Sequence, residues 1–299
     1  MTPPAEIFSA AMTDGVQLRI RRGGNPDGVR LYLSNGNGFA IDGYRVFWEP
    51  LLAEFELILF DMRNHGRNEA SGADGHHYHQ MAADIGSVFH EVDRRLGHRP
   101  SVGVFHSMSG RASMKHAVQM EWVWDALVLF DPPDVPPPGH EQYEAMRNFE
   151  LRLMQWALER QDSFASPDEL LQSYATNRAQ SRWVTEARSD MARAILRSAG
   201  DGTYRLACRR ELEASIYLAA LTLDLWPSAK DYGGPVILIG ADPEAKGAPP
   251  TAAANRALAR DGDYDYEAVP ETGHLLQIER PDACREAMLR FLRKHSLAQ

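Results

Sequence analysis

Short apolar runs alternate with segments of helical periodicity through the first half of the chain. The apolar runs have the length of β-strands and cover residues 29–34, 56–61, 102–105 and 126–131. The helical segments lie between them and cover residues 44–54, 79–96 and 111–119. Strands that are apolar throughout are typical of a parallel sheet buried on both faces. The pattern therefore predicts an α/β fold with a mostly parallel central sheet and helices on both of its faces.

The two ends of the chain add further elements to this sheet. Residues 16–22 alternate apolar and polar side chains directly after an Asp-Gly turn signal, which predicts one arm of an N-terminal hairpin. Apolar strand patterns return at 235–239 and 264–269, and a helical pattern follows at 281–295.

The middle of the chain follows a different pattern. After a proline-rich connection at 131–141, the periodicity is helical almost as far as the strand at 235–239. Ser166, with Glu169 three residues later, has the capping-box arrangement that begins a helix, and this helix is predicted to run to Arg178. We therefore divide the chain into a first part of the core (1–135), an all-helical cap (136–230) and a second part of the core (231–299).

Composition and charge narrow the classes of partner. The formal net charge is −9, which is unfavourable for binding a phosphate backbone. The two cysteines, Cys208 and Cys284, lack the spacing of a zinc site or of a disulfide framework. The chain has no apolar run of membrane-spanning length and no signal-peptide pattern at its N-terminus. We expect a cytoplasmic protein that acts on a small molecule and binds neither nucleic acid nor a membrane.

The segment FHSMSG at 105–110 places Ser107 at a corner between a predicted strand and a predicted helix. Loops at the carboxyl ends of parallel strands form the crevice where ligands bind. A serine at this corner is either an N-cap of the helix or a nucleophile. A nucleophilic serine needs a base, an acid that orients the base, and N–H donors for an oxyanion.

Candidates for the base and the acid follow the ends of other predicted strands. His274 stands between the last strand and the last helix, which makes it the candidate base. Asp242 and Asp131 each follow a strand, so either side chain can point into the same crevice. We take Asp242 as the acid and Asp131 as the alternative, with Glu244 as a more remote third candidate.

Oxyanion donors are expected from two backbone segments. Met108 begins the helix after the candidate nucleophile, so its N–H lies at the positive end of that helix. The loop SNGNGFAIDGY at 34–44 follows another strand, and Gly36 and Gly38 allow its backbone to approach a neighbour closely.

Together these segments resemble those of the α/β-hydrolase superfamily, of the serine type with a helical cap. FHSMSG resembles the nucleophile elbow G-x-S-x-G, and the order Ser107, Asp, His274 matches the chain order of the family. DMRNHGRNE at 61–69 resembles a second loop of the family. NGNGF at 35–39 resembles its oxyanion loop, and this resemblance makes Phe39 the second oxyanion donor.

Three further features near these segments need an interpretation. Phe105 stands where the elbow usually has glycine, which predicts that the following helix has moved away or that the Phe side chain points into a different space, with a slightly relaxed turn. Three neighbouring histidines, His76, His77 and His79, are interpreted as a solvated loop and not as a metal site. His106, beside the nucleophile, is interpreted as structural.

The sequence predicts a serine hydrolase that cleaves a small or medium, largely apolar carboxylic ester and needs no metal or organic cofactor. A minority of the apolar cap residues should line the roof of its pocket. The candidates are Met146, Met154, Trp156, Trp183, Tyr217 and Leu218. The same residues would also suit a carbon-carbon bond hydrolase, a lactonase, a thioesterase, a perhydrolase or a ligand receptor without turnover.

Overall fold

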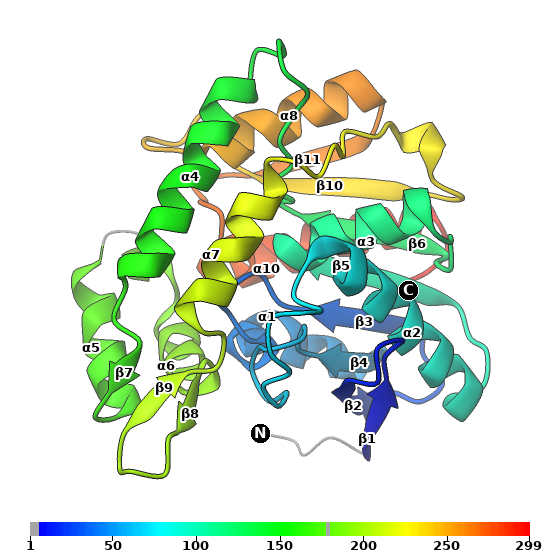
Figure 1. The fold of residues 1–299 in the computed structure, drawn as a ribbon. Helices are drawn as coiled ribbons and strands as arrows, with labels where there is room; N and C mark the ends of the chain where they lie inside the picture. Colours follow the sequence, from blue (N-terminus) through cyan, green and yellow to red (C-terminus); the bar gives the residue numbers. More distant parts are fainter. Residues whose placement is uncertain (1–5, 178–179) are drawn as a thin grey trace.

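A computed structural model of the protein describes residues 6–177 and 180–299 (Figure 1). Two expectations concern residues outside these ranges. Residues 1–5 belong to the N-terminus that is expected to lack a signal peptide, and Arg178 is the expected end of the helix that begins at Ser166. Within the described ranges, no helix combines the length and the apolar character needed to cross a membrane.

A mostly parallel sheet forms the centre of the molecule, as the apolar runs predict. Within the described residues it has eight strands in the order β1-β2-β4-β3-β5-β6-β10-β11. β1 and β2 form the N-terminal hairpin and β2 pairs antiparallel with β4, whereas the other neighbours are parallel. The strands are β1 (Glu6–Ala11), β2 (Gln17–Gly24), β3 (Arg30–Ser34), β4 (Glu56–Phe60), β5 (Ser101–His106), β6 (Ala126–Phe130), β10 (Val236–Ala241) and β11 (Asp265–Val269).

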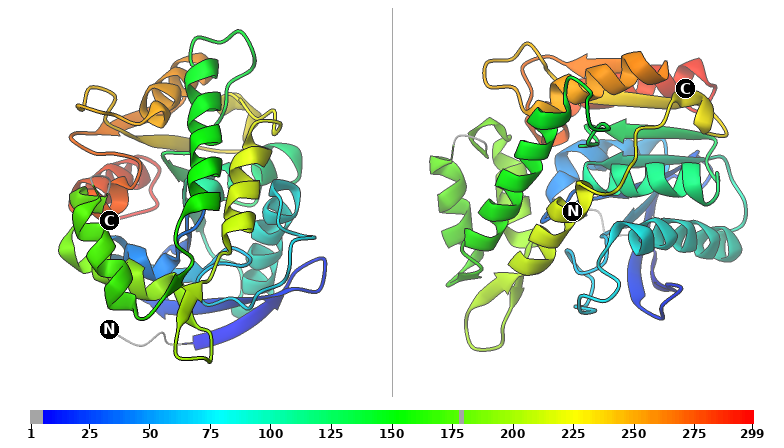
Figure 2. Two further views of the ribbon diagram at one scale, coloured as in Figure 1. Left: turned by 60° about the vertical axis from the view of Figure 1, so that its left-hand side comes forward. Right: turned by 45° about the horizontal axis from the view of Figure 1, so that its top comes forward.

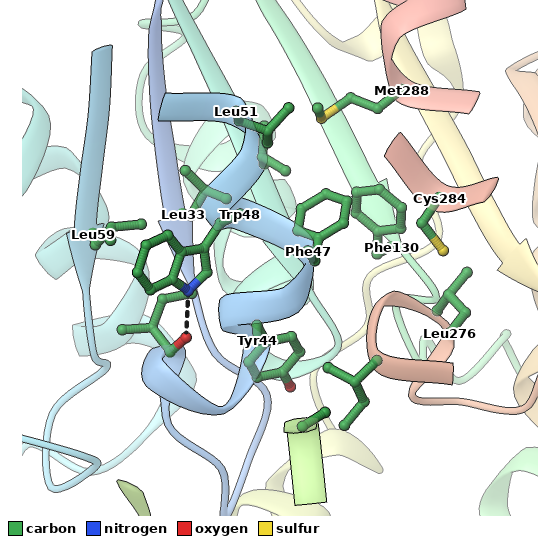
Figure 3. Close-up of a cluster of buried hydrophobic side chains, with 14 of the residues drawn as sticks. Leu33, Tyr44, Phe47, Trp48, Leu51, Leu59, Phe130, Leu276, Cys284 and Met288 are labelled. Carbon is green, nitrogen blue, oxygen red and sulfur yellow. Dashed lines mark hydrogen bonds between the residues drawn. The ribbon is translucent and has the colours of Figure 1, made fainter. Parts of the chain in front are cut away.

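Helices cover both faces of this sheet (Figures 1 and 2). α2 (Tyr78–Leu96), α3 (Met108–Gln119) and α8 (Pro250–Gly262) pack on one face. α1 (Arg45–Trp48), α9 (Leu276–Glu279) and α10 (Pro281–Lys294) pack on the other. Figure 3 shows the second layer, where Phe47 of α1 meets Phe130 of β6 with ring centroids 5.2 Å apart, next to Met288 of α10.

Neighbouring residues of one strand point to opposite faces, which explains the uninterrupted apolar runs. In β3, Leu31 and Leu33 belong to the cluster under α1 and α10, whereas Tyr32 belongs to the cluster under α2 and α3. All five residues of that strand are buried. The parallel sheet therefore has no face left for polar side chains, and the polar groups gather at its ends.

The segment between β6 and β10 forms a separate layer beside the sheet edge. It contains α4 (Tyr143–Glu159), α5 (Pro167–Thr176), α6 (Thr185–Ala194) and α7 (Arg210–Ala220), and α4 and α7 lie side by side (Figure 2). It also contains a small sheet in the order β7-β9-β8, formed by β7 (Ser163–Phe164), β8 (Leu196–Ser198) and β9 (Tyr204–Leu206). Strands of two or three residues are too short to give a periodic pattern, so the sequence predicts only the helices of this segment.

Two helical regions differ from the periodicity. The expected helix at 44–54 is one turn of α-helix between two 3₁₀ turns, η1 (Ile41–Tyr44) and η2 (Glu49–Ala53). Pro50 lies in the second turn, where it removes a backbone donor. α8, in the alanine-rich segment between β10 and β11, is a helix that the sequence analysis does not include.

The strand that leads to Ser107 has a specific place for Phe105. The Phe105 side chain is fully buried, and its ring packs against Phe60 and Trp124 with centroids 6.3 and 5.6 Å away. It also covers Gly103, because a Cβ placed on this glycine would lie 2.6 Å from Cε2 of Phe105. Gly103 lies two residues before Phe105 on the same face of β5, and because it has no side chain it leaves room for the Phe105 ring.

Gly103→Ala should destabilise the fold by about 1–3 kcal/mol, because the added methyl group overlaps both the Phe105 ring and Cδ1 of Leu127. Urea unfolding of Gly103→Ala, Phe105→Leu and the double variant measures this overlap. We expect the double variant to be less destabilised than the sum of the two single changes, since leucine leaves space for the new methyl group. Additive losses would contradict this account of the strand.

Candidate active site

Ser107 occupies a sharp corner between β5 and α3. Its backbone has φ +54° and ψ −118°, a conformation that L-residues rarely adopt. Two hydrogen bonds hold the corner: its N–H donates to Phe130 O of β6 at 3.0 Å, and its carbonyl accepts from the Arg111 N–H at 2.9 Å. The small side chain of Ser109 closes the turn by donating to His106 O at 3.0 Å. The elbow geometry is thus present although Phe105 replaces the usual glycine.

The side chain of Ser107 contacts the candidate base. Oγ of Ser107 and Nε2 of His274 are 2.9 Å apart, which is hydrogen-bond distance. His274 lies in the loop between β11 and α9. Its other ring nitrogen, Nδ1, is 2.6 Å from Oδ2 of Asp131. A carboxylate can only accept, so Nδ1 carries a proton and Nε2 is left to accept the hydroxyl proton of Ser107.

The structure places Asp131, and not Asp242, against this histidine. Asp131 directly follows β6 with φ +42° and is fully buried. Its carboxylate also accepts from the Ala241 N–H at 3.0 Å, the Thr251 hydroxyl at 2.5 Å and the Asn255 amide at 3.0 Å. These donors hold an ionised acid in one orientation beside His274.

Asp242, which the sequence analysis takes as the acid, has different hydrogen-bond partners. Asp242 accepts hydrogen bonds from the N–H groups of Glu271, at 2.8 Å, and Glu244, at 2.9 Å. These backbone donors lower the pKa of its carboxyl group. Asp242 therefore joins two loops near the site, while Glu244 forms a surface ion pair with Arg256 at 2.7 Å.

The glycine-rich loop after β3 approaches the nucleophile closely. A Cβ placed on Gly36 would lie 3.1 Å from the Cβ of Ser107 and 2.9 Å from Nδ1 of His106. The Phe39 N–H donates within the loop, to Gly36 O at 3.2 Å, and this bond competes with an oxyanion role for Phe39. In the described part of the chain the N–H groups of Asn37 and Met108 have no acceptor, and Asn37 lines the same cavity as Ser107.

A buried chain of hydrogen bonds joins this loop to the base. Nε2 of His106 is 2.8 Å from the carbonyl oxygen of His274, so Nε2 must carry the proton. Burial lowers the pKa of His106 to about 3, so the ring is neutral and Nδ1 is an acceptor. Tyr44 Oη donates to Nδ1 at 2.8 Å and accepts from the Gly36 N–H at 3.4 Å. His106 thus positions the backbone of the base, and Tyr44 connects it to the glycine-rich loop.

A second buried histidine, His65, holds the glycine-rich loop after β3 through a hydrogen bond. His65 donates from Nδ1 to Arg63 O at 2.8 Å, which leaves Nε2 to accept from the Gly38 N–H at 3.0 Å. Burial lowers the pKa of His65 to about 4. The ring of His76 stacks on it with centroids 5.9 Å apart. Sequence reasoning missed Tyr44 and His65, since only their distant partners reveal their roles.

The three neighbouring histidines do not share one environment. His76 is buried, contrary to its interpretation as part of a solvated loop, because it packs on His65 and is 3.1 Å from the Asn64 amide through Nδ1. His77 and His79 are exposed, and His77 caps the N-terminus of α2. Across the described ranges, no group of three or more His, Cys, Asp or Glu side chains is arranged to hold a metal ion.

Ser107 and His274 open into a cavity of about 580 Å³ beneath α4 and α7. Three of the six cap residues named from the sequence line it, namely Trp156, Trp183 and Tyr217. Met146 is instead buried between helices, and Leu218 is about half exposed. The other apolar lining residues are Phe39, Pro133, Phe149, Leu153, Pro249 and Leu275.

A buried cluster of charges joins the cavity roof to the core. Arg111 of α3 donates to Glu150 of α4 at 2.7 Å and to the Tyr78 hydroxyl at 2.8 Å. Its Nε lies 3.4 Å from Asp134, in the connection between β6 and α4. Burial raises the pKa of Asp134 to about 7. Because removing either charged partner would leave the other uncompensated in a dry environment, this cluster fixes α4 above the core.

The unfolding free energy should depend on pH through His65. Its folded-state pKa is about 4, below the ordinary 6.5, so between these values the unfolded chain binds a proton that the folded chain does not. As the pH falls through this window, wild type should lose stability relative to His65→Gln by about 1.4 kcal/mol per pH unit. Urea unfolding of both proteins at several pH values measures the difference, and parallel curves would contradict the buried neutral state.

Comparisons with solved structures find the same fold in other proteins. The chain aligns over 96% of its length with the crystal structure of E-2-(acetamidomethylene)succinate hydrolase, at 19% identity and a TM-score of 0.78, and covers 99% of that chain. A thermophilic esterase from Thermogutta terrifontis, in a malate-bound structure, is 18% identical, with a TM-score of 0.69 and coverage of 97% and 99% of the two chains. A bromoperoxidase from Bacillus anthracis is 14% identical, with a TM-score of 0.71 and coverage of 96% and 100%. These likenesses show the shared fold.

A search of curated proteins finds no match to the sequence. The family comparison matches residues 31–287, from β3 to α10, and so includes the elbow, the acid and the base. The chain therefore belongs to the alpha/beta hydrolase family.

Proposed function

We propose that the protein is a serine hydrolase that cleaves small or medium, largely apolar carboxylic esters. The observation that carries this proposal is the unbroken hydrogen-bond chain from Ser107 through His274 to Asp131, at the wall of a mostly apolar cavity. One of the similar structures is described as an esterase.

The first step forms an acyl-enzyme. Nε2 of His274 accepts the hydroxyl proton while Oγ of Ser107 attacks the ester carbonyl carbon. Asp131 keeps Nδ1 protonated and stabilises the imidazolium that forms. The carbon–oxygen bond to the alcohol then breaks, and the alcohol leaves with the proton from His274.

The second step releases the acid. A water molecule gives a proton to His274 and attacks the acyl carbon, and Ser107 regains its proton as its bond to that carbon breaks. Both steps place negative charge on the carbonyl oxygen. We assign its stabilisation to the N–H of Met108, at the start of α3, and to the N–H of Asn37 in place of Phe39. No metal or organic cofactor takes part in these steps.

The cavity favours a substrate with an apolar portion. Phe149, Leu153 and Trp156 of α4 and Tyr217 of α7 face the space above Ser107. A volume of about 580 Å³ accommodates a small or medium molecule. The hydrogen bonds that join Ser107, His274 and Asp131 favour catalysis over a role as a receptor without turnover.

Wild-type protein should hydrolyse p-nitrophenyl esters, and Ser107→Ala should lose at least about three orders of magnitude in kcat, because no other group can form the acyl-enzyme. Steady-state kinetics over a series of acyl lengths measures this loss and the length that fits the cavity. Circular dichroism checks that the variant is folded. Equal turnover by wild type and variant would refute the role of Ser107, and single turnover with retained product would favour the receptor.

The two aspartates provide a matched pair for assigning the acid. Asp131→Asn should lower kcat by on the order of 10⁴-fold, because an amide at this position favours the wrong tautomer of His274. Asp242→Asn removes the same charge from a residue that holds only loop backbone, and should change kcat by less than about tenfold. The reverse ranking would return the role of the acid to Asp242.

A further inference from the structure

One end of the cavity differs in chemistry from the rest. The apolar lining described above lies mainly on α4 and α7, whereas polar side chains approach from the segment between α5 and α6 and from α9. These polar residues are Asn177, Gln180, Arg182 and Glu279. Among the lining residues that the structure describes, Arg182 is the one lysine or arginine.

The position of Arg182 is fixed relative to the base. It belongs to the 3₁₀ turn η3 (Gln180–Arg182), and its Nη2 donates to Lys246 O at 3.2 Å. A Cβ placed on Gly273 would lie 3.4 Å from Nη1 of Arg182. Since Gly273 immediately precedes His274, the guanidinium lies beside the backbone of the base, at the wall of the cavity.

The guanidinium keeps donors available for a ligand. No carboxylate oxygen of the described residues lies within 4 Å of it, and the hydrogen bond to Lys246 O uses one of its five N–H groups. The side chain is partly exposed. A planar cation with free N–H groups at the wall of a cavity is suited to bind a carboxylate through two parallel hydrogen bonds.

The two acids that line the cavity are already engaged elsewhere. Glu150 accepts from Arg111 at 2.7 Å and is almost fully buried. Glu279 accepts from the Gly273 N–H at 2.7 Å; burial raises the pKa of its carboxyl group, and the nearby charge of Arg182 lowers it in part. Neither carboxylate comes within 4 Å of the guanidinium of Arg182 to form a direct ion pair.

We infer that the substrate carries a carboxylate, in addition to the bond that is cleaved, and that Arg182 binds it. This inference rests on the proposed hydrolase function and narrows its substrate class to monoanionic esters with an apolar portion. Arg182 is then a specificity-determining residue, because it selects between substrates without taking part in the bond changes at Ser107.

The test compares esters that differ by one negative charge. On the acyl side the pair is p-nitrophenyl hemisuccinate and p-nitrophenyl pentanoate, and on the alcohol side it is 4-acetoxybenzoate and 4-acetoxybenzamide. For at least one pair, wild type should prefer the anionic ester in kcat/KM. Arg182→Gln should reduce that preference by about tenfold or more, mainly through KM, and Arg182→Lys should retain part of it.

Arg280→Gln is the matched control for charge. Arg280 is exposed on the neighbouring surface, where it pairs with Glu271, and it does not line the cavity. Arg280→Gln removes the same unit of charge as Arg182→Gln, and the preference for the anionic ester should stay within about twofold of wild type. An equal loss in both variants, an equal effect of Arg182→Gln on both members of a pair, or no preference in wild type would overturn the inference.

Failure of the proposed function would give a different result. If wild type hydrolyses none of the four esters, the inference is tested by binding alone, with succinate monomethyl ester as the probe. Stabilisation of wild type but not of Arg182→Gln against thermal unfolding would support a carboxylate site without esterase activity. No stabilisation of wild type would overturn the inference as well.

Discussion

The backbone conformation of Ser107 is the constraint on which the site depends. A positive φ at a residue with a side chain costs free energy, and the surrounding structure must supply it. β5 lies between β3 and β6, so the strand before the corner is fixed on both sides, and α3 holds the chain after it. Gly103 and Phe105 show how closely the strand is packed up to its last residues. A corner fixed in this way presents the hydroxyl of Ser107 without a loop that could move.

The other functional groups reach this corner because parallel strands end at the same edge of the sheet. Asp131 follows β6, His274 follows β11, and the glycine-rich loop follows β3. Their mutual positions are set by hydrogen bonds and not by the strands alone. Tyr44 and His106 link the loop to the carbonyl of the base, and each has one possible arrangement of protons. These hydrogen bonds align the glycine-rich loop with the base.

The sequence predicts the fold class, the hairpin and the corner at Ser107, because each depends on local patterns of apolar residues and glycine. It does not determine which aspartate meets His274. Asp131 and Asp242 both follow strands that are neighbours in the sheet, and the choice depends on donors from Ala241, Thr251 and Asn255, which local spacing cannot show. The burial of His76 was missed for a similar reason, since the ring that covers it belongs to a different loop.

The groups that hold Asp131 belong to the core and not to the segment between β6 and β10. The chain leaves the core directly after this residue and returns at β10, with α4 to α7 in between. Donors from the chain after its return to the core, in β10 and α8, hold the carboxylate. The orientation of the acid is therefore set by core residues, whereas the buried charges around Arg111 fix the roof above it. The residue at which this segment leaves the core is thus one that the core itself holds in place.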